Sequence, residues 1–450
     1  MRLTPSRRLY LLGAMLLVAM TICSRKFDSL AAPFFMVPLA VAAIAYLLAM
    51  REFFSTEKFP RRVIAIGLAL AAVWHVLFLL QPPGSDDDVH RYVWDGRVQR
   101  LGYNPYLAVP SDPALAALHT PETRTLNNAY LPSPYPAGAQ LFFRAVTVLH
   151  ESVFAFKVVF VFCDFAIVLL LLDFLRRTGQ GEHWILAYAW HPLLAIEVAG
   201  SGHIDIVGAL LLLISFAMLE RRWRALAALA FGLAVSVKFL PIVLVPVYWK
   251  RVRMRDAALA AFVFALMYAP FLNHGRIPIG SLGTYFHSFR FNDPVFAMLE
   301  RVASPEMAVG FAVLAGFLTA VWMRRNSTTR RTSTTRVGTG AFDRPASEAS
   351  AASAVAFAWP MAASLLCAPV VYPWYLLWLL PFLRSTSTIP IIVWTVSIIP
   401  TYYVWHLRAL GCPWIVPGWI MVLEYGLVAM AAVIVAFARK RPPATPRSPG

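Results

Sequence analysis

The sequence predicts an all-α polytopic membrane protein, and three observations lead to this class. Hydrophobic residues make up 59% of the 450 residues, charged residues only 14%, and the mean hydropathy is +0.63, which is unlike a soluble globular protein. Apolar runs long enough to cross, or nearly cross, a ~30 Å hydrocarbon core recur along the chain. Basic residues form short clusters between these runs, so the formal charge of +17 indicates membrane orientation and argues against nucleic acid as a partner.

The apolar runs predict a bundle of about 12–14 transmembrane or half-membrane helices, because several of them are short for a full crossing. The runs lie near residues 9–23, 30–50, 62–81, 152–175, 184–200, 204–219, 225–249, 257–273, 306–323, 353–371, 374–383, 386–405 and 414–438. The first follows three arginines, as in a signal peptide. No small-x-small cleavage pattern ends it, and a second run begins at Leu30, so we expect an uncleaved membrane helix.

The basic clusters predict the orientation of these helices, because short cytoplasmic loops are enriched in Lys and Arg. The clusters assigned to the cytoplasmic side are Arg2, Arg7 and Arg8; Arg51, Lys58, Arg61 and Arg62; Arg176 and Arg177; Arg221, Arg222 and Arg224; Lys250, Arg251, Arg253 and Arg255; the arginines of 324–344; and Arg439, Lys440 and Arg441. With these clusters inside, both termini are cytoplasmic.

The 225–249 run interrupts this alternation, because it has basic clusters at both ends and a single crossing would place one of them outside. Two half-membrane helices bent near Lys238 resolve the conflict, and such discontinuous helices form where a polar site lies at membrane depth. The alternative is one long tilted helix whose Lys238 side chain snorkels to the surface. The hairpin places Lys238 on the outer side of the membrane.

The expected organisation has six parts. These are N-terminal transmembrane helices (1–81), a first large periplasmic loop with short surface helices (82–150), central transmembrane helices with a break near 238 and a periplasmic loop at 274–305 (151–325), a disordered basic cytoplasmic loop (326–353), C-terminal transmembrane helices (354–438) and a cytoplasmic tail (439–450). The 326–353 segment is assigned as disordered because it is rich in Ser, Thr and Arg and has no apolar periodicity.

The stretch from Ser85 to Tyr106 concentrates charge in an otherwise apolar chain. Three carboxylates, Asp86, Asp87 and Asp88, open it directly after an apolar run. Such a cluster at a membrane surface is either a solvated loop or a functional site. If a helix follows, Asp88, Arg91 and Asp95 recur at spacings of three and four residues and share one face, so a carboxylate can hold the guanidinium.

The same orientation gathers further polar residues on the outer side, although it was derived from the basic clusters alone. His203 and Asp205 start a helix beside Gly200 and Gly202, where free N–H groups favour an anion. The other outward polar residues are Lys238, His274, His287, Arg290, Tyr372, Trp374 and Tyr375. Outward aromatic residues, namely Tyr130, Tyr135, Tyr285, Phe286, Phe289 and Trp374, are an interfacial belt, a substrate cleft, or both.

These motifs resemble the GT-C glycosyltransferases of the bacterial polyprenol-phosphate-mannose-dependent type, which include the mycobacterial α-mannosyltransferases. The resembling pieces are Asp87–Arg97, Gly102–Tyr106, Tyr135-Pro136 with Ala139-Gln140, Gly202–Asp205, Lys238 with Pro241, and Tyr372–Trp378. They span most of the expected membrane domain, and the first piece is the most specific. The resemblance implies a GT-C-like helical bundle.

The resemblance also implies a function. An enzyme of the bacterial inner membrane would transfer a sugar, mannose in this group, from a polyprenyl-phosphate-linked donor to a glycan, glycolipid or other acceptor hydroxyl, on the periplasmic or outer face and with inversion. A loop Asp would be the general base, and the motif favours Asp87 and Asp88 over Asp86. His90 stands where Tyr is common, and three Asp stand where two are usual, so the identity of the base stays open.

The chemistry fits these residue types. A carboxylate suits removal of a hydroxyl proton, and a leaving lipid phosphate needs fixed cations such as Arg91, Lys238 or Arg290. The predicted substrate-binding residues are Arg91, Asp95, Arg97, Tyr106, His203, Asp205, Lys238, His287, Arg290, Tyr372, Trp374 and Tyr375. Acidic runs also bind divalent cations, so Asp86, Asp87 and Asp88 are candidate ligands for such an ion, and the sequence implies no other cofactor.

Two other classes compete with a glycosyltransferase. A transporter or flippase for an anionic lipid-linked sugar would also use a basic, aromatic cavity, but transporters often have duplicated halves with matching broken helices. The chain has one evident interrupted run and no internal repeat. A non-catalytic subunit of a cell-envelope assembly is the other alternative. The four cysteines lack metal-ligand spacing, and the sequence contains no Rossmann or P-loop pattern.

Overall fold

The computed structural model describes residues 3–27, 33–84, 88–273, 278–335 and 346–440. Eight segments of these residues are helical, long and apolar enough to span a membrane: α1 (Pro5–Arg25), α2 (Pro33–Ser55), α3 (Arg61–Leu79), α6 (Val153–Arg177), α11 (Met254–Tyr268) with η6 (Ala269–Phe271), α14 (Pro305–Thr335), η9 (Thr386–Thr388) with α16 (Ile389–Ser397), η10 (Ile399–Tyr402) and α17 (Tyr403–Ala409), and α18 (Gly418–Lys440). The π-helix η4 (Leu194–Gly200) and α8 (Asp205–Glu220) together are also long and apolar enough, and this bent pair is either a broken span or a re-entrant loop.

The remaining helices are shorter. They are α4 (Asp88–Arg100), η2 (Pro113–Leu118), η3 (Pro121–Thr123), α5 (Ala137–Leu149), α7 (Trp184–Ala189), α9 (Arg224–Val237), η5 (Leu240–Leu244), α10 (Val245–Tyr248), α12 (Leu282–Ser288), α13 (Pro294–Leu299), α15 (Ala346–Leu366), η7 (Pro373–Trp378) and η8 (Leu380–Phe382). No β-strand occurs in the described ranges. The predicted all-α polytopic bundle of full and half-membrane helices is confirmed.

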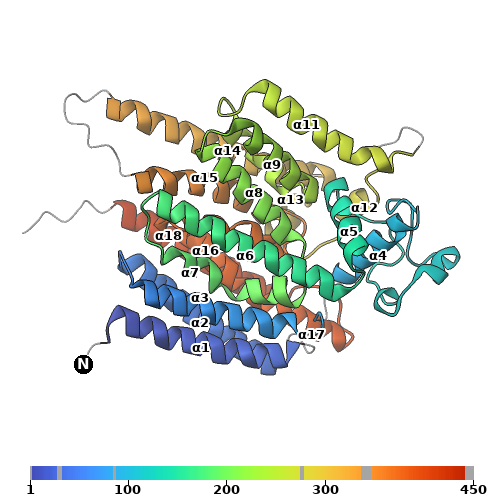
Figure 1. The fold of residues 1–450 in the computed structure, drawn as a ribbon, viewed down its shortest axis with the longest axis horizontal. Helices are drawn as coiled ribbons and strands as arrows, with labels where there is room; N and C mark the ends of the chain where they lie inside the picture. The colour runs from blue at the N-terminus through green and yellow to red at the C-terminus, as the bar shows by residue number, and fades with distance from the viewer. Residues whose placement is uncertain (1–2, 28–32, 85–87, 274–277, 336–345, 441–450) are drawn as a thin grey trace, which may run out of the picture.

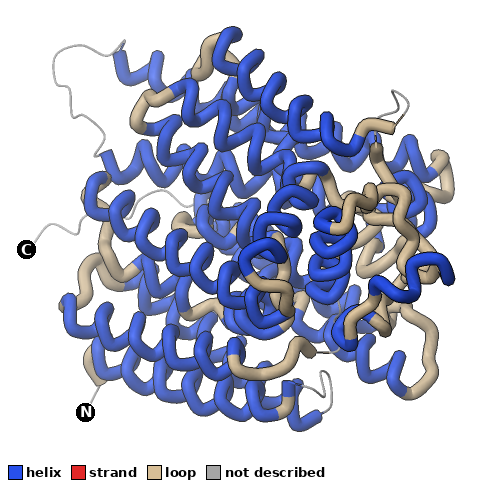
Figure 2. Tube along the Cα trace, turned by 45° about the vertical axis from the view of Figure 1, so that its right-hand side comes forward, coloured by secondary structure: helices blue, strands red, loops and turns tan. Residues whose placement is uncertain are grey.

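The long helices lie roughly side by side, with the start of α1 and the end of α18 at the same end of the bundle (Figure 1). We term this the terminal end. The opposite end carries α4, α5 and α12 and is termed the loop end. Most of the irregular backbone also gathers at the loop end (Figure 2).

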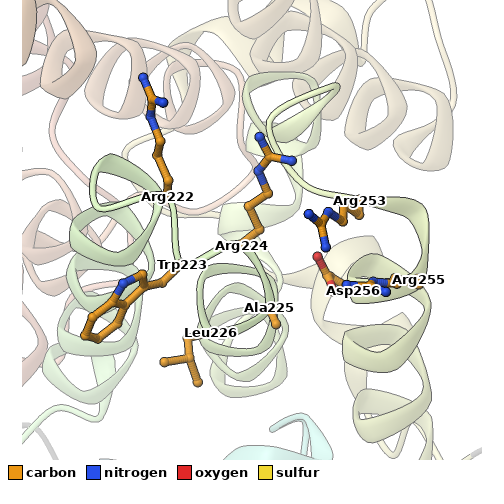
Figure 3. A pocket seen from close by; sticks show the side chains of 8 residues that line it. All are labelled: Arg222, Trp223, Arg224, Ala225, Leu226, Arg253, Arg255 and Asp256. Atoms are coloured by element: carbon orange, nitrogen blue, oxygen red, sulfur yellow. Dashed lines mark ion pairs between the residues drawn. The ribbon is translucent and has the colours of Figure 1, made fainter.

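The 224–253 segment reverses direction within the bundle. α9 ends at Val237, Lys238 has an extended backbone (φ −157°, ψ 141°), and η5 begins two residues later. Pro241 and Pro246 lack the N–H groups that would continue an α-helix. The two ends of the segment, Arg224 and Arg253, line one hollow (Figure 3), so the chain leaves and returns to the same end. The turning point is Lys238, where the sequence analysis places the bend.

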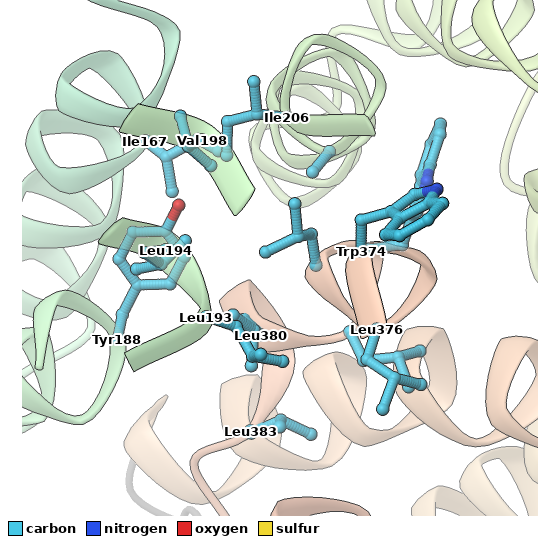
Figure 4. Packing of buried hydrophobic residues seen from close by; sticks show 14 of the residues in the cluster. Ile167, Tyr188, Leu193, Leu194, Val198, Ile206, Trp374, Leu376, Leu380 and Leu383 are labelled. Atoms are coloured by element: carbon cyan, nitrogen blue, oxygen red, sulfur yellow. The ribbon is translucent and has the colours of Figure 1, made fainter. Parts of the chain in front are cut away.

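A second break lies between η4 and α8, whose axes differ by 113°. The π-helix buries its apolar side chains in the same core as η7 and η8: Leu194 and Val198 belong to one cluster with Leu376 and Leu380 (Figure 4). Gly208 lets α8 approach η7, because a Cβ at that position would lie 1.9 Å from the Trp378 ring. The start of α8 is thereby held beside η7.

The helices flanking the expected disordered loop at 326–353 extend into this range. α14 continues as helix to Thr335, and α15 begins at Ala346, so only 336–345 separates them, and that segment lies outside the described residues. The physical reason is that a long membrane helix is already nucleated, and adding a residue to it costs little even where the pattern is polar.

Candidate active site

The first part of the site is the start of α4. The Asp88 carboxylate, in the first turn of α4, accepts a hydrogen bond from the Tyr135 hydroxyl at 3.1 Å, and an acid at this position suits the helix dipole. Tyr92 stacks on Phe143 of α5, with ring centroids 4.5 Å apart. Gly96 permits this close packing, because a Cβ there would lie 2.5 Å from the Phe143 carbonyl oxygen. The α4–α5 pair therefore fixes the position of Asp88.

Behind Asp88, a buried polar network holds the loop that carries Tyr135. Asp95 is fully buried, and its carboxylate accepts hydrogen bonds from Arg91 Nε at 2.9 Å, from Gln140 Nε2 at 2.9 Å and from the Ser133 hydroxyl. Arg91 also donates to the Leu131 carbonyl at 3.1 Å from both terminal nitrogens. These contacts favour the alternative in which a carboxylate holds Arg91, and they give Arg91 and Asp95 a positioning role.

The second part of the site is an ion pair between α8 and the bend after α9. Lys238 Nζ lies 2.8 and 3.1 Å from the two oxygens of Asp205, which is buried at the start of α8. The Trp378 indole N–H donates to the same carboxylate at 2.7 Å. Lys238 Nζ also lies 3.7 Å from the centre of the Tyr375 ring, at cation–π distance. The Lys238 side chain remains 24% exposed.

Tyr285 connects the two parts. Its hydroxyl is hydrogen-bonded to that of Tyr375, beneath Lys238. Burial raises the pKa of Tyr285 well above its usual value, and the charges of Tyr372, Asp88 and Asp205 raise it further. The pKa of Tyr135 is raised by burial and by Asp88 in the same way. These tyrosines are therefore neutral hydrogen-bond donors at physiological pH.

An aromatic stack borders the ion pair. The Trp374 ring lies between His203 and Tyr372, with centroid distances of 4.0 and 4.3 Å and interplanar angles of 10°. His203 Nδ1 lies 2.9 Å from a carboxylate oxygen of Glu197, and the Tyr402 hydroxyl donates to the other oxygen. Glu197 belongs to the π-helix, a local irregularity that is frequent at functional sites.

Glu197 and Tyr402 were missed by the sequence analysis. A glutamate within the apolar 184–200 run was the available signal, because an ionisable residue inside a membrane segment is costly unless it has a partner. Its hydroxyl partner lies 205 residues further along the chain, so no local pattern could identify the pair.

Arg97 and Tyr106, predicted to bind substrate, support the loop between α4 and α5. Arg97 donates to Glu151 at 2.5 Å and to the Leu118 carbonyl at 2.6 Å. The Tyr106 hydroxyl donates to the Tyr135 backbone carbonyl at 2.8 Å, so it holds the residue that contacts Asp88 without reaching the site itself.

Arg290 and His287 each pair with a glutamate that is near in sequence. The Arg290 guanidinium makes two contacts with Glu300, one of them at 3.0 Å, and donates to the Phe289 carbonyl at 2.6 Å. His287, with a side chain that is 63% exposed, pairs with Glu306 at 3.2 Å. Neither side chain joins the cluster around Asp88 and Asp205.

Asp86 and Asp87 lie outside the described residues, so the site geometry refers to Asp88 alone. Within the described ranges, no group of three or more His, Cys, Asp or Glu side chains has an arrangement that could hold a metal ion. Among the described residues, the site consists of two carboxylates, one lysine and several phenols.

Comparison with known proteins gives one family. A family model described as "Alpha-(1->6)-mannopyranosyltransferase, N-terminal domain" matches residues 8–253, more than half of the 450-residue chain. No curated protein matches the chain. The crystal structure of ArnT from Cupriavidus metallidurans bound to undecaprenyl phosphate is similar, with a TM-score of 0.40 and 13% identity, covering 83% of this chain and 74% of that chain. The range of the family model includes Asp88, Asp205 and Lys238.

Proposed function

Because the chain belongs to the α-(1→6)-mannopyranosyltransferase family and is a membrane glycosyltransferase, we propose that it transfers mannose from a polyprenyl-phosphate-linked donor. The acceptor is a hydroxyl of a cell-envelope glycan, glycolipid or related molecule. The reaction takes place at the loop end, which faces the periplasm or exterior in the proposed orientation.

The observation that carries this proposal is a set of contacts in an apolar bundle: Lys238 pairs with Asp205 and lies over the Tyr375 ring, and Tyr375 is hydrogen-bonded to Tyr285. Asp88, held by Tyr135, supplies a second carboxylate. A sugar phosphate needs both anion-binding and hydrogen-bonding groups, and neutral phenols supply donors without repelling an anion. A donor on a membrane lipid reaches such a site from the bilayer, so the enzyme needs no nucleotide-binding domain.

Asp88 is the proposed general base among the described residues. As the new glycosidic bond forms, the acceptor hydroxyl gives its proton to the carboxylate, and the bond from the anomeric carbon to the phosphate oxygen breaks. Attack on the face opposite the phosphate inverts the anomeric configuration. Tyr135 keeps the Asp88 side chain in place through its hydrogen bond. Asp87, one residue earlier, is the alternative base.

Lys238 is the proposed cation for the leaving phosphate. A lysine ammonium has three donor hydrogens, and the pairing with Asp205 leaves the partly exposed Lys238 able to contact a further acceptor. The Tyr285 and Tyr375 hydroxyls lie close enough to assist. Polyprenyl phosphate then leaves with the bonding electron pair and the negative charge that the ammonium stabilises.

The direct test uses purified protein in liposomes that contain polyprenyl-phosphate mannose and, in parallel, other polyprenyl-phosphate sugars. We expect release of polyprenyl phosphate and a mannosylated acceptor only with the mannose donor, and loss of both products in Asp88→Asn combined with Asp87→Asn. Movement of the intact donor between leaflets, with no release of polyprenyl phosphate, would contradict the proposal and favour a flippase.

A further inference from the structure

A basic hollow of about 460 Å³ lies away from the site, between the turn joining α8 to α9 and the turn leading into α11. α8 runs from Asp205 to Glu220, so this turn is ~24 Å from the start of the helix and belongs to the terminal end. The residues that line the hollow are Arg222, Trp223, Arg224, Leu226, Arg253 and Arg255, with Ala225 and Asp256 beside them (Figure 3).

The arginines of these two turns fall into two groups. Arg221 and Arg251 are not among the lining residues, and each is paired with a carboxylate: Arg221 with Asp173 at 2.5 Å and Arg251 with Glu220 at 2.7 Å. By contrast, no carboxylate among the described residues pairs with Arg222, Arg224 or Arg253, all of which are exposed. In the part of the chain that the structure describes, these three guanidinium groups on the hollow therefore have no carboxylate counterion.

The one acid at the hollow is insufficient to balance this charge. Asp256 approaches Arg255 at 3.6 Å, a long ion pair with a guanidinium that is 74% exposed. Figure 3 shows Arg224 and Arg253 on facing sides of the hollow. Several exposed guanidinium groups with one acid among them give the hollow the charge pattern of an anion site.

The backbone of the α8–α9 turn supports a binding role for Arg222. Arg222 has a φ of +63°, and the Trp223 N–H bonds to the Met218 carbonyl at 2.9 Å, which is the usual end of a helix at a left-handed residue. Glycine is the residue that adopts this conformation without strain. The chain instead has an arginine there, and its side chain lines the hollow.

The surroundings of the hollow distinguish a lipid from a soluble anion. Trp223 is 55% exposed, and a tryptophan at this level is typical of the membrane interface. α11 is a candidate span whose apolar side chains, including Met254, Leu259 and Phe262, are largely exposed. A diacyl lipid with its phosphate in the hollow could lay its chains along this exposed face.

We propose that the hollow binds the headgroup of an anionic phospholipid from the leaflet at the terminal end, with the acyl chains against α11. Basic pockets between membrane helices bind such headgroups, and each Lys or Arg near an anionic surface contributes to the attraction. The bound lipid links the α8–α9 turn to α11. Because α8 begins at Asp205 and α9 ends before Lys238, it would also restrain the two helices that bring this pair together.

The test measures lipid retention by native mass spectrometry and thermal unfolding in detergent supplied with phosphatidylglycerol, with phosphatidylcholine, or with inorganic phosphate alone. We expect wild-type protein to retain and be stabilised by phosphatidylglycerol selectively. Arg224→Gln with Arg253→Gln should lower retention roughly tenfold or more. The matched control, Arg61→Gln with Arg62→Gln, removes the same charge from another exposed cluster of the terminal end and should retain the lipid.

Three results would overturn the proposal. An equal loss of phosphatidylglycerol retention in the Arg61/Arg62 control would mean that the lipid is attracted by the total surface charge and not by the hollow. Equal retention of phosphatidylcholine would remove the role of the anionic headgroup, and stabilisation by inorganic phosphate without lipid would assign the hollow to a soluble anion. A variant with Arg224→Lys and Arg253→Lys keeps the charge and should retain most of the lipid, which separates lost binding from misfolding.

Discussion

Replacing Lys238 by methionine tests the ion pair at the centre of the site. The change leaves the Asp205 carboxylate, only 1% exposed, with the Trp378 indole as a donor but without its cation. At 2.8 Å and an effective dielectric constant of ~20, the gross attraction between the charges is about 6 kcal/mol. Desolvation offsets part of it, and removing one partner of a buried pair costs ~3–5 kcal/mol. Because Lys238 is 24% exposed, we expect Lys238→Met to lower the free energy of unfolding by about 3 kcal/mol, the low end of this range.

The assay is a double-mutant cycle with Lys238→Met, Asp205→Asn and the double variant, each measured for thermal unfolding and for donor affinity. The double variant removes both charges, so it should recover much of the stability that either single change loses. If Lys238 also contacts the donor phosphate, the double variant will remain weak in donor binding. Lys238→Arg keeps the charge without the compact ammonium and should recover part of the affinity.

Two outcomes would refute this reasoning. A Lys238→Met protein as stable as wild type would show that the lysine snorkels and that the pair contributes little. Recovery of both stability and donor affinity in the double variant would limit the pair to a structural role, and the phosphate would need another cation.

Four further predictions follow from single positions. Asp88→Asn should leave folding intact and lower transfer by ~10²–10⁴-fold; full activity would move the base to Asp87. Gly208→Ala should destabilise the protein by ~1–3 kcal/mol or more in thermal unfolding, because the new Cβ meets an indole ring at 1.9 Å, whereas Gly426→Ala, with open space, should not. Burial lowers the pKa of His90 in the folded protein, so as pH falls below 6.5 the histidine is protonated in the unfolded chain first. The free energy of unfolding should therefore fall with pH in this range, and it should fall less in His90→Gln. A cysteine at position 88 should be labelled from outside and one at position 224 from the cytoplasm; the reverse would overturn the orientation.

The fold class and part of the site could be predicted from the sequence because both depend on local composition. The apolar runs marked the helices, and the conflict between the basic clusters at 221–224 and 250–255 indicated a reversal near Lys238. The Asp205–Lys238 pair was predicted as two separate substrate contacts. Its members are 33 residues apart on different helices, and only the packing of α8 against α9 brings them together.

The contacts of Arg97 and Arg290 show why chemical type alone is insufficient to identify a phosphate ligand. Arg97 and Arg290 have the charge that a phosphate site needs, but the first is 54 residues from its Glu151 partner and the second 10 residues from Glu300. Whether an arginine is available to substrate depends on which carboxylates the folded loops bring near it. Sequence spacing indicated this only for Arg91 and Asp95, because both lie on one helix at a four-residue interval.

The breaks in the helices explain how the charged side chains of Asp205 and Lys238 can be stable in an apolar bundle. Asp205 starts α8 after a 113° bend. Lys238 directly follows α9 and has an extended backbone, and Tyr375 belongs to a short 3₁₀ segment. Within a continuous membrane helix, each polar side chain would face hydrocarbon or a neighbouring apolar face at considerable cost. At a break, side chains from three elements converge and satisfy one another, and the partly exposed Lys238 opens the cluster toward a substrate. On this reasoning, straightening the bend by Pro241→Ala would separate the pair and reduce donor binding even though no charged residue had changed.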